Sequence, residues 1–230
     1  MGTPAPTEDH FAADLRGFGW RGVLAILAIV LTGNVFVGKM MVIPVGALLV
    51  LLWAWRSRTP WREIGYARPR TWIGTLALGV VLGIAFKFVM KAVVMPLLGA
   101  DPINHAYHFL AGNRAMLPAA VWAMIAAGFG EETVFRGYLF ERLGKLMGTG
   151  RSTRTSIVLV TSVLFGLGHY SNQGIAGVQQ ATLVGLLYGT IFAITGRIWL
   201  LMAAHAAFNL TALAMIYWNL ESDVAHLIFK

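Results

Sequence analysis

The chain has 230 residues, of which 57% are hydrophobic and only 12% are charged. A soluble domain carries about 25% charged residues, so this composition excludes an ordinary soluble domain and predicts an all-α, polytopic membrane protein embedded in the lipid bilayer. The net charge of +8 does not indicate a nucleic-acid partner, because the basic residues lie in short segments between apolar runs. The absence of cysteine excludes disulfides, a thiol nucleophile and thiolate metal sites.

The chain divides into a short polar start and a long apolar remainder. Residues 1–19 are mixed in charge and are predicted to form a disordered cytoplasmic tail, and residues 20–220 a single helical membrane domain. A helix needs about 20 residues to cross the hydrocarbon core. Seven apolar segments predict about seven transmembrane helices, with the first break at Gly38-Lys39 and with the second and fifth segments on the short side: 20–38, 40–56, 72–98, 116–141, 155–169, 177–195 and 198–219.

Lys and Arg are concentrated in alternate connecting segments. Residues 56–70 include five arginines and residues 141–154 four basic residues, whereas 169–177, which we expect to be a loop, has none. Because cytoplasmic loops are enriched in Lys and Arg, the pattern predicts a multi-pass protein of the cell (inner) membrane with its N-terminus in the cytoplasm and its C-terminus outside. Lys87 and Lys91, near the outer end of the third segment, are expected to extend their side chains to the outer interface, with a cavity-lining or lipid-facing role as the alternative.

The fourth segment carries charges in G-E-E-T-V-F-R-G, residues 130–137. Ionisable residues inside a membrane are candidate functional sites. Glu132 and Arg136 are four residues apart and are predicted to form an ion pair along the helix. Glu131 lies about 100° around the helix from Glu132 and is free to point elsewhere. We interpret the Glu132–Arg136 pair as structural support and Glu131 as the chemical group. Small neighbours such as Gly128 are expected to let a partner helix approach Glu131.

Two further segments carry histidine. The fifth ends F-G-L-G-H with His169, and the seventh contains H-A-A-F-N, which places His205 and Asn209 on one helix face. Distances from the flanking charges are compatible with a single site containing both histidines and Glu131, nearer the cytoplasmic half of the membrane. A carboxylate and two imidazoles can activate a water, either by holding a metal or by direct proton abstraction. An amide donor suits an oxyanion hole, so the set predicts amide hydrolysis.

The three motifs together resemble those of the CPBP (Abi) family, the CAAX-processing and bacteriocin-processing intramembrane proteases. E-E-T-V-F-R resembles the family's E-E-x-x-x-R, F-G-L-G-H its F-x-x-x-H, and H-A-A-F-N its H-x-x-x-N. Residues 188–199 and W-R-E-I-G-Y at 61–66 are similar to further parts of the family. The resemblance covers about 116–210 well, which we expect to be the catalytic core, and 61–115 loosely.

The resemblance implies a role for each motif residue. Catalytic roles fall to four side chains: Glu131 as the group that activates water, His169 and His205 as the two essential histidines, and Asn209 in the oxyanion hole. Glu132 and Arg136 match the supporting pair. Two mechanisms remain open: a zinc ion held by Glu131, His169 and His205, or a glutamate acting without a metal.

The predicted function is therefore that of an intramembrane endopeptidase, whose site opens towards the cytoplasm and whose substrate is a membrane-associated peptide or protein. One alternative is a non-proteolytic bacteriocin-immunity or membrane scaffold protein, which would tolerate loss of Glu131. Another is a transporter that uses Glu131 and the histidines as a proton relay. Transporters often contain matching repeats in their two halves, and this chain has no convincing repeat, so the transporter ranks last.

Overall fold

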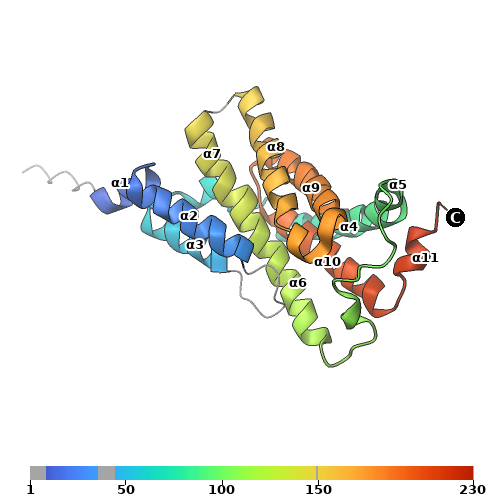
Figure 1. Ribbon diagram of the computed structural model, residues 1–230. Coiled ribbons are helices and arrows are strands. Elements are labelled where there is room, and N and C mark those ends of the chain that lie inside the picture. Colours follow the sequence, from blue (N-terminus) through green and yellow to red (C-terminus); the bar gives the residue numbers. More distant parts are fainter. Residues whose placement is uncertain (1–8, 36–44, 149, 230) are drawn as a thin grey trace, which may run out of the picture.

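The computed structural model describes residues 9–35, 45–148 and 150–229, and within these ranges the chain is helical and contains no β-strand (Figure 1). Two short turns are 3-10 helices (η1 and η3), and two stretches are π-helical (η2 and η4). The elements in chain order are α1 (His10–Arg16), α2 (Trp20–Val35), α3 (Val45–Arg56), η1 (Trp61–Ile64), α4 (Trp72–Val89), η2 (Met90–Val94), α5 (Met95–Leu97), η3 (His108–Leu110), α6 (Leu117–Glu132), η4 (Thr133–Tyr138), α7 (Leu139–Met147), α8 (Arg151–Leu167), α9 (Tyr170–Thr195), α10 (Trp199–Tyr217) and α11 (Glu221–Ala225).

Three helical stretches among the described residues are long and apolar enough to cross a membrane: α4 with its continuation to Leu97, α9 and α10. A fourth would be the bent pair α1–α2, if it forms one span. The predicted number of about seven transmembrane helices is therefore not confirmed. Helices α3 and α8 have only 12 and 17 residues, and a span needs about 20, whereas α6 continues directly into η4 and α7. The predicted break at Gly38-Lys39 lies outside the described residues.

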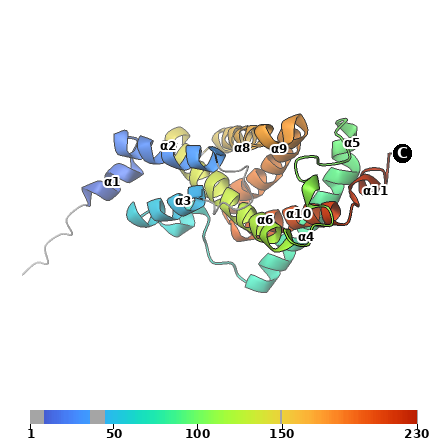
Figure 2. The same ribbon diagram turned by 60° about the horizontal axis from the view of Figure 1, so that its bottom comes forward.

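Helix α10 is the centre of the fold. It packs against α4 and α6, while α8 and α9 pair with each other beside them (Figures 1 and 2). The contact between α4 and α10 depends on Gly83, because a Cβ atom there would lie 2.0 Å from the Ala204 carbonyl oxygen. Gly166 has the same effect between α8 and α9, where an added Cβ would lie 2.0 Å from Thr182 Oγ1. Small residues thus bring backbones together, as is typical of membrane helices.

Residues 61–66 hold the fold together near the start of α10. After η1 the chain turns at Gly65, whose φ of 83° favours glycine. The Gly65 carbonyl accepts a hydrogen bond from the Ile198 amide (3.0 Å). The hydroxyls of Tyr66 and Thr133 are hydrogen bonded at 2.7 Å. This segment therefore fixes the π-helical turn η4 relative to the N-terminal end of α10.

Several predicted boundaries differ from the structure. Residues 10–16, predicted as part of a disordered tail, form α1, where Trp53 Nε1 donates a hydrogen bond to the Leu15 carbonyl (2.9 Å). Residues 169–177 were predicted as a loop, but α9 begins at Tyr170 and kinks at Gly174. Its polar first turns, which include Gln173, line an internal cavity, so their polarity does not indicate a loop.

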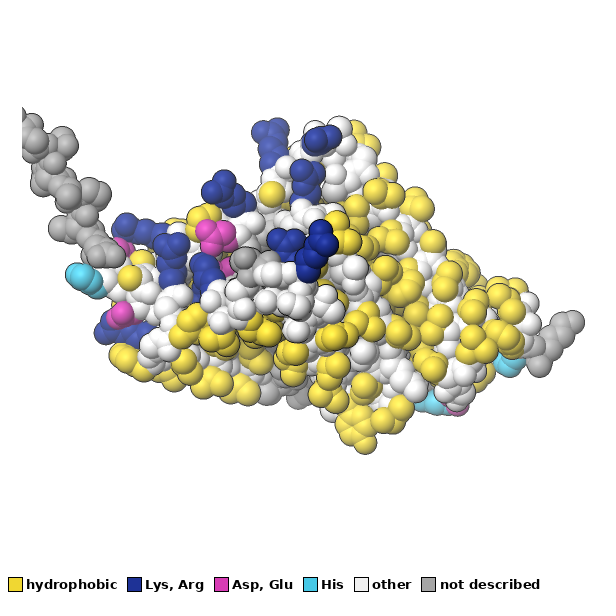
Figure 3. Space-filling model, turned by 90° about the horizontal axis from the view of Figure 1, so that it is seen from above, with side chains coloured by type: hydrophobic (Ala, Val, Ile, Leu, Met, Phe, Trp, Pro, Cys, Tyr) yellow, Lys and Arg dark blue, Asp and Glu magenta, His cyan; other side chains and the backbone are white. Residues whose placement is uncertain are grey.

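The surface separates apolar from basic side chains. Figure 3 shows Lys and Arg side chains gathered over one part of the face, and hydrophobic side chains over most of the rest. Most exposed basic residues come from the segments 56–70 and 145–154 and from Arg197, and Arg114 is a further exposed one. Large apolar side chains of α2, α4 and α8 are exposed, as expected of helices that face lipid. Lys87 and Lys91, predicted to extend to the interface, are instead buried.

Candidate active site

The motif residues come from neighbouring parts of α6, η4, α8–α9 and α10. Glu131 and Glu132 end α6, and Arg136 follows in η4. Helix α10 approaches α6 closely because position 128 is glycine: a Cβ there would lie 2.6 Å from the Ala206 backbone nitrogen. The expected role of Gly128 therefore agrees with the packing, which brings His205 against the two glutamates.

His205 contacts both glutamates, one with each ring nitrogen. Its Nδ1 lies 2.8 Å from Glu132 Oε1, and its Nε2 lies 3.5 Å from Glu131 Oε2. A carboxylate accepts hydrogen bonds, so Nδ1 carries a proton and donates it to Glu132. In the neutral imidazole, Nε2 then presents its lone pair on the side of Glu131. We call these two facing groups the Glu131–His205 pair.

Glu132 is the more deeply buried of the two carboxylates. Its side chain is 0% exposed, compared with 16% for Glu131. Arg136 Nη1 lies 3.0 Å from Glu132 Oε1, so the two residues form the ion pair that their spacing predicts. The same Glu132 oxygen also accepts the hydrogen bond from His205, a contact that the predicted Glu132–Arg136 pair did not include. Burial with two partners fixes Glu132, whereas Glu131 retains access to its surroundings.

His169 follows the end of α8, at the N-cap position of α9. Its Nδ1 lies 2.9 Å from the Phe165 carbonyl oxygen. A carbonyl can only accept, so Nδ1 donates and Nε2 of the neutral ring keeps its lone pair. Among the described residues no hydrogen bond or ion pair joins His169 to Glu131 or to His205. The structure therefore places His169 beside the site without direct contact with the Glu131–His205 pair.

Asn209 lies one turn after His205 on α10. Its Nδ2 donates a hydrogen bond to the Met124 carbonyl of α6 (3.3 Å). This bond fixes the orientation of the amide, because the opposite assignment of oxygen and nitrogen would place two acceptors together. The amide has a second N–H, which is the group that an oxyanion hole requires.

Comparison with known protein families agrees with this arrangement. Residues 113–211 match the family model described as Type II CAAX prenyl endopeptidase Rce1-like, which includes all three motifs. The match covers less than half of the chain, and this part of it is similar to the Rce1-like family. The match confirms the resemblance to the CPBP family of CAAX proteases, and it supports a membrane-bound protease as the general class of activity. Searches of the curated proteins and of the solved structures found no significant match.

Among the described residues, the three predicted zinc ligands are not brought together around one point. In the described part of the chain, no three His, Cys, Asp or Glu side chains lie close enough to hold one metal ion. Glu131 and His205 face each other, but His169 is turned to the Phe165 carbonyl. This arrangement does not fit a three-ligand zinc centre, so the chemistry below is derived from the side chains alone.

Phe165, the first residue of the F-x-x-x-H motif, has a structural role that the sequence did not reveal. Its ring centroid lies 4.8 Å from that of His169 and 5.9 Å from that of His205, and the Arg136 guanidinium lies 4.8 Å above the ring. Tyr188, fully buried on α9, also packs against the His205 ring at 5.7 Å. These aromatic rings hold the polar side chains of the candidate site in an apolar setting. Only the motif spacing of Phe165 could have indicated its place.

Proposed function

We propose that the protein is an intramembrane endopeptidase that hydrolyses a peptide bond of a membrane-associated peptide or protein. The observation that carries this proposal is the Glu131–His205 pair, whose facing atoms are 3.5 Å apart while the opposite ring nitrogen is bound to Glu132. One water can lie within hydrogen-bond distance, about 2.8 Å, of both facing atoms. That water would be the nucleophile.

The proposed reaction begins with proton transfer from this water to Glu131. The water oxygen forms a bond to the carbonyl carbon of the peptide, and the resulting oxyanion accepts a hydrogen bond from the second N–H of Asn209. Collapse of the tetrahedral intermediate breaks the C–N bond, and Glu131 returns its proton to the leaving amine. His205 keeps the water in line, because Glu132 fixes its tautomer and its orientation.

His169 is assigned a positioning role beside this pair. Its donor nitrogen is bound to the Phe165 carbonyl, which leaves Nε2 as an acceptor for a substrate N–H or for the water. The shared packing against Phe165 keeps His169 close to His205. We propose that substrate binding brings His169 Nε2 into the reaction site. The zinc alternative requires a larger movement, since His169 would have to join both other ligands.

The proposed orientation places the exposed basic end in the cytoplasm of a bacterial cell, at the inner membrane, and the active site opening towards it. Enrichment of exposed arginine at 56–70 and 145–154 supports this orientation. We further propose that α2, α3, α6 and α8 lie within the bilayer beside the longer helices, which gives about seven spans. Because the chain has no cysteine, single cysteines at Arg154 and at Asn113 would report the orientation by labelling intact cells. Labelling of position 154 from outside would contradict it.

The experiment that tests the proposed activity compares peptide termini, by mass spectrometry, between cells that make the native protein and cells that make Glu131→Gln at equal level. The substitution removes the base but nearly preserves the shape. We expect a set of termini to disappear in the variant, and those peptides identify the substrate and show whether it is prenylated. Unchanged termini, together with rescue of a gene-loss phenotype by Glu131→Gln, would replace the protease with a binding or immunity role.

A further inference from the structure

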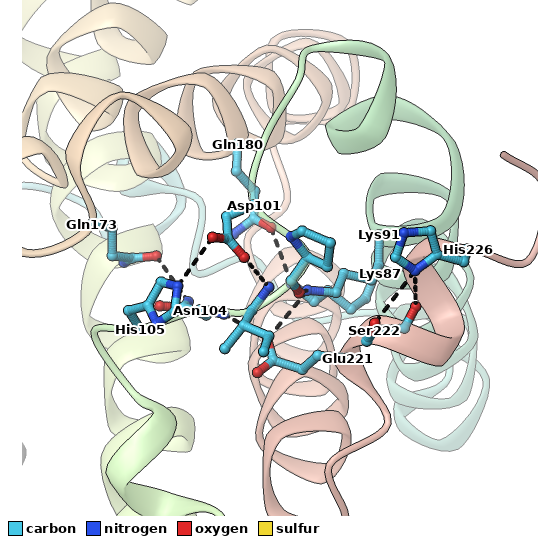
Figure 4. Close-up of polar contacts among 12 residues, drawn as sticks. Lys87, Lys91, Asp101, Asn104, His105, Gln173, Gln180, Glu221, Ser222 and His226 are labelled. Atoms are coloured by element: carbon cyan, nitrogen blue, oxygen red, sulfur yellow. Dashed lines mark hydrogen bonds and ion pairs between the residues drawn. The ribbon is translucent and has the colours of Figure 1, made fainter. Parts of the chain in front are cut away.

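Two buried lysines line a cavity at the end of α4 that is remote from the basic surface. Lys87 lies in the last turn of α4 and Lys91 in the π-helical turn η2, and they are only 7% and 8% exposed. Lys87 is 15 residues after Trp72, about 22 Å along the helix axis from the arginine-rich end. The cavity has a volume of about 260 Å³. Figure 4 shows both side chains turned inward, with α9 and the loop before η3 around them.

Lys91 has a carboxylate as its counter-charge. Its ammonium donates to the Pro102 carbonyl and lies 3.2 Å from Glu221 Oε1. The same Glu221 oxygen accepts a hydrogen bond from the Asn104 amide (3.1 Å). Glu221 is itself buried, so its charge is matched with that of Lys91 and it closes the end of the cavity. This pair is a structural unit (Figure 4).

Lys87 has only uncharged partners. Its ammonium donates to Gln180 Oε1 (3.0 Å) and lies 4.9 Å from the centroid of the Phe208 ring. No carboxylate in the described part of the chain lies within ion-pair distance of Lys87. A buried charge without a counter-charge is strongly destabilising, and this cost is avoided either when the ammonium loses its proton or when an anion binds beside it.

The other acidic residue of the cavity does not provide that counter-charge. Asp101 lies at the exposed mouth, where its side chain is 59% exposed and pairs with His105 at 3.1 Å. Inside the mouth, two lysines therefore face a single carboxylate. The remaining polar lining consists of amide side chains, including Asn172 and Gln173, which donate hydrogen bonds as readily as they accept them.

We propose that this cavity is a binding site for a small oxyanion, a carboxylate or a phosphate, held by the Lys87 ammonium and the neighbouring amides. Ligand pockets for drug-sized molecules start at about 300 Å³, so the volume suits a single anionic group better than a peptide. The cavity lining includes neither Glu131 nor His205, although Lys87 packs against Phe208, three residues after His205. The lining on α10 begins at Ala212, seven residues after His205 and about 10 Å further along the helix. The anion comes either from solution or from the headgroup of an anionic lipid.

The test measures the thermal unfolding midpoint of the full-length protein by tryptophan fluorescence. Inorganic phosphate or acetate replaces chloride at constant ionic strength for protein in detergent. A second series compares nanodiscs of phosphatidylglycerol with nanodiscs of phosphatidylcholine. The variants are Lys87→Met, Lys87→Arg, which keeps the charge, and Lys145→Met as a control at an exposed lysine of α7.

The proposal expects one of two results. A rise of several degrees with phosphate or acetate, retained in Lys87→Arg and Lys145→Met and lost in Lys87→Met, identifies an anion from solution. The same pattern with phosphatidylglycerol only identifies a lipid headgroup. In either case the affinity of Lys87→Met falls by at least about tenfold, because one partner of a buried charge pair is gone. Without ligand, Lys87→Met should unfold at the same temperature as the native protein or higher.

Two results overturn the proposal. One is that neither phosphate, acetate nor phosphatidylglycerol raises the unfolding midpoint of the native protein. The other is that a probe raises the midpoint of Lys87→Met as much as that of the native protein, since the ligand is then bound elsewhere. Both readouts are independent of proteolysis, so failure of the protease proposal would leave this test unaffected.

Discussion

Glu131 and Glu132 offer a matched pair of substitutions that separates catalysis from structural support. The two residues are adjacent and chemically identical, so Glu→Gln changes the same atoms in both. Their surroundings differ: Glu132 is fully buried between Arg136 and His205, whereas Glu131 is partly exposed and lies 3.5 Å from His205. We expect Glu132→Gln to reduce both stability and activity, and Glu131→Gln to reduce activity alone.

The magnitudes follow from burial. Glu132→Gln leaves the Arg136 guanidinium, 2% exposed, without its counter-charge, and breaking such a buried pair costs about 3–5 kcal/mol. For a chain of this length that corresponds to a fall of roughly 6–20 °C in the unfolding midpoint. Glu131→Gln removes no ion pair with Arg or Lys, so the midpoint should change little. Loss of a general base lowers the cleavage rate by about 10²–10⁴-fold.

The assay combines thermal unfolding of the purified variants with cleavage of the peptides that the comparison of termini identifies. Equal unfolding midpoints for Glu132→Gln and the native protein would refute the argument from the buried ion pair. Full cleavage activity in Glu131→Gln would refute the assignment of the base. If Glu131→Gln were instead the destabilised variant, the two carboxylates would have exchanged roles.

Two further predictions concern helix packing and metal. Gly128→Ala should destabilise the protein by about 1–3 kcal/mol and lower the cleavage rate, because the added methyl group forces α10 and His205 away from α6; Gly144→Ala, where nothing lies within 4 Å of the new methyl group, is the control and should leave both unchanged or raise stability. A normal rate for Gly128→Ala would contradict the packing argument. Removal of metal with a chelator should leave the cleavage rate unchanged, because no three-ligand group is assembled among the described residues. Stoichiometric zinc in the purified protein, with activity lost on chelation and restored by zinc, would contradict the glutamate mechanism.

Local rules predicted much of the fold and part of the site. Apolar runs located most of the helices to within a few residues, since burial in lipid or in the core requires such runs. The spacing of Glu132 and Arg136 predicted their ion pair, because residues four apart meet within one helix. Gly128 was recognised as a place of close packing for the same local reason. Each of these inferences depends on contacts within one helix or on composition alone.

The features that the sequence did not reveal depend on how separate helices meet. The π-helical turns at Thr133–Tyr138 and Met90–Val94 have no compositional signal in this chain, although such turns are frequent at functional sites. The inward direction of Lys87 depends on a cavity bounded by α9 and α10, which no pattern within α4 discloses. The polar residues at the N-terminal end of α9 were interpreted as a loop, because the sequence does not show that they line a cavity. These contacts join residues far apart in the chain.

The relation between the two glutamates shows how a partner helix changes a local inference. Helical geometry separates Glu131 and Glu132 by about 100°, which predicted that they serve different neighbours. His205 reconciles this separation with a single site, because the two nitrogens of one imidazole ring face in different directions and contact both carboxylates. The carboxylate that is bound to Arg136 then fixes the tautomer of the ring that faces the other carboxylate. In this chain, a single histidine on the neighbouring helix α10 connects the fully buried Glu132 with the partly exposed Glu131. The absence of a side chain at Gly128 makes this close approach of α10 sterically feasible.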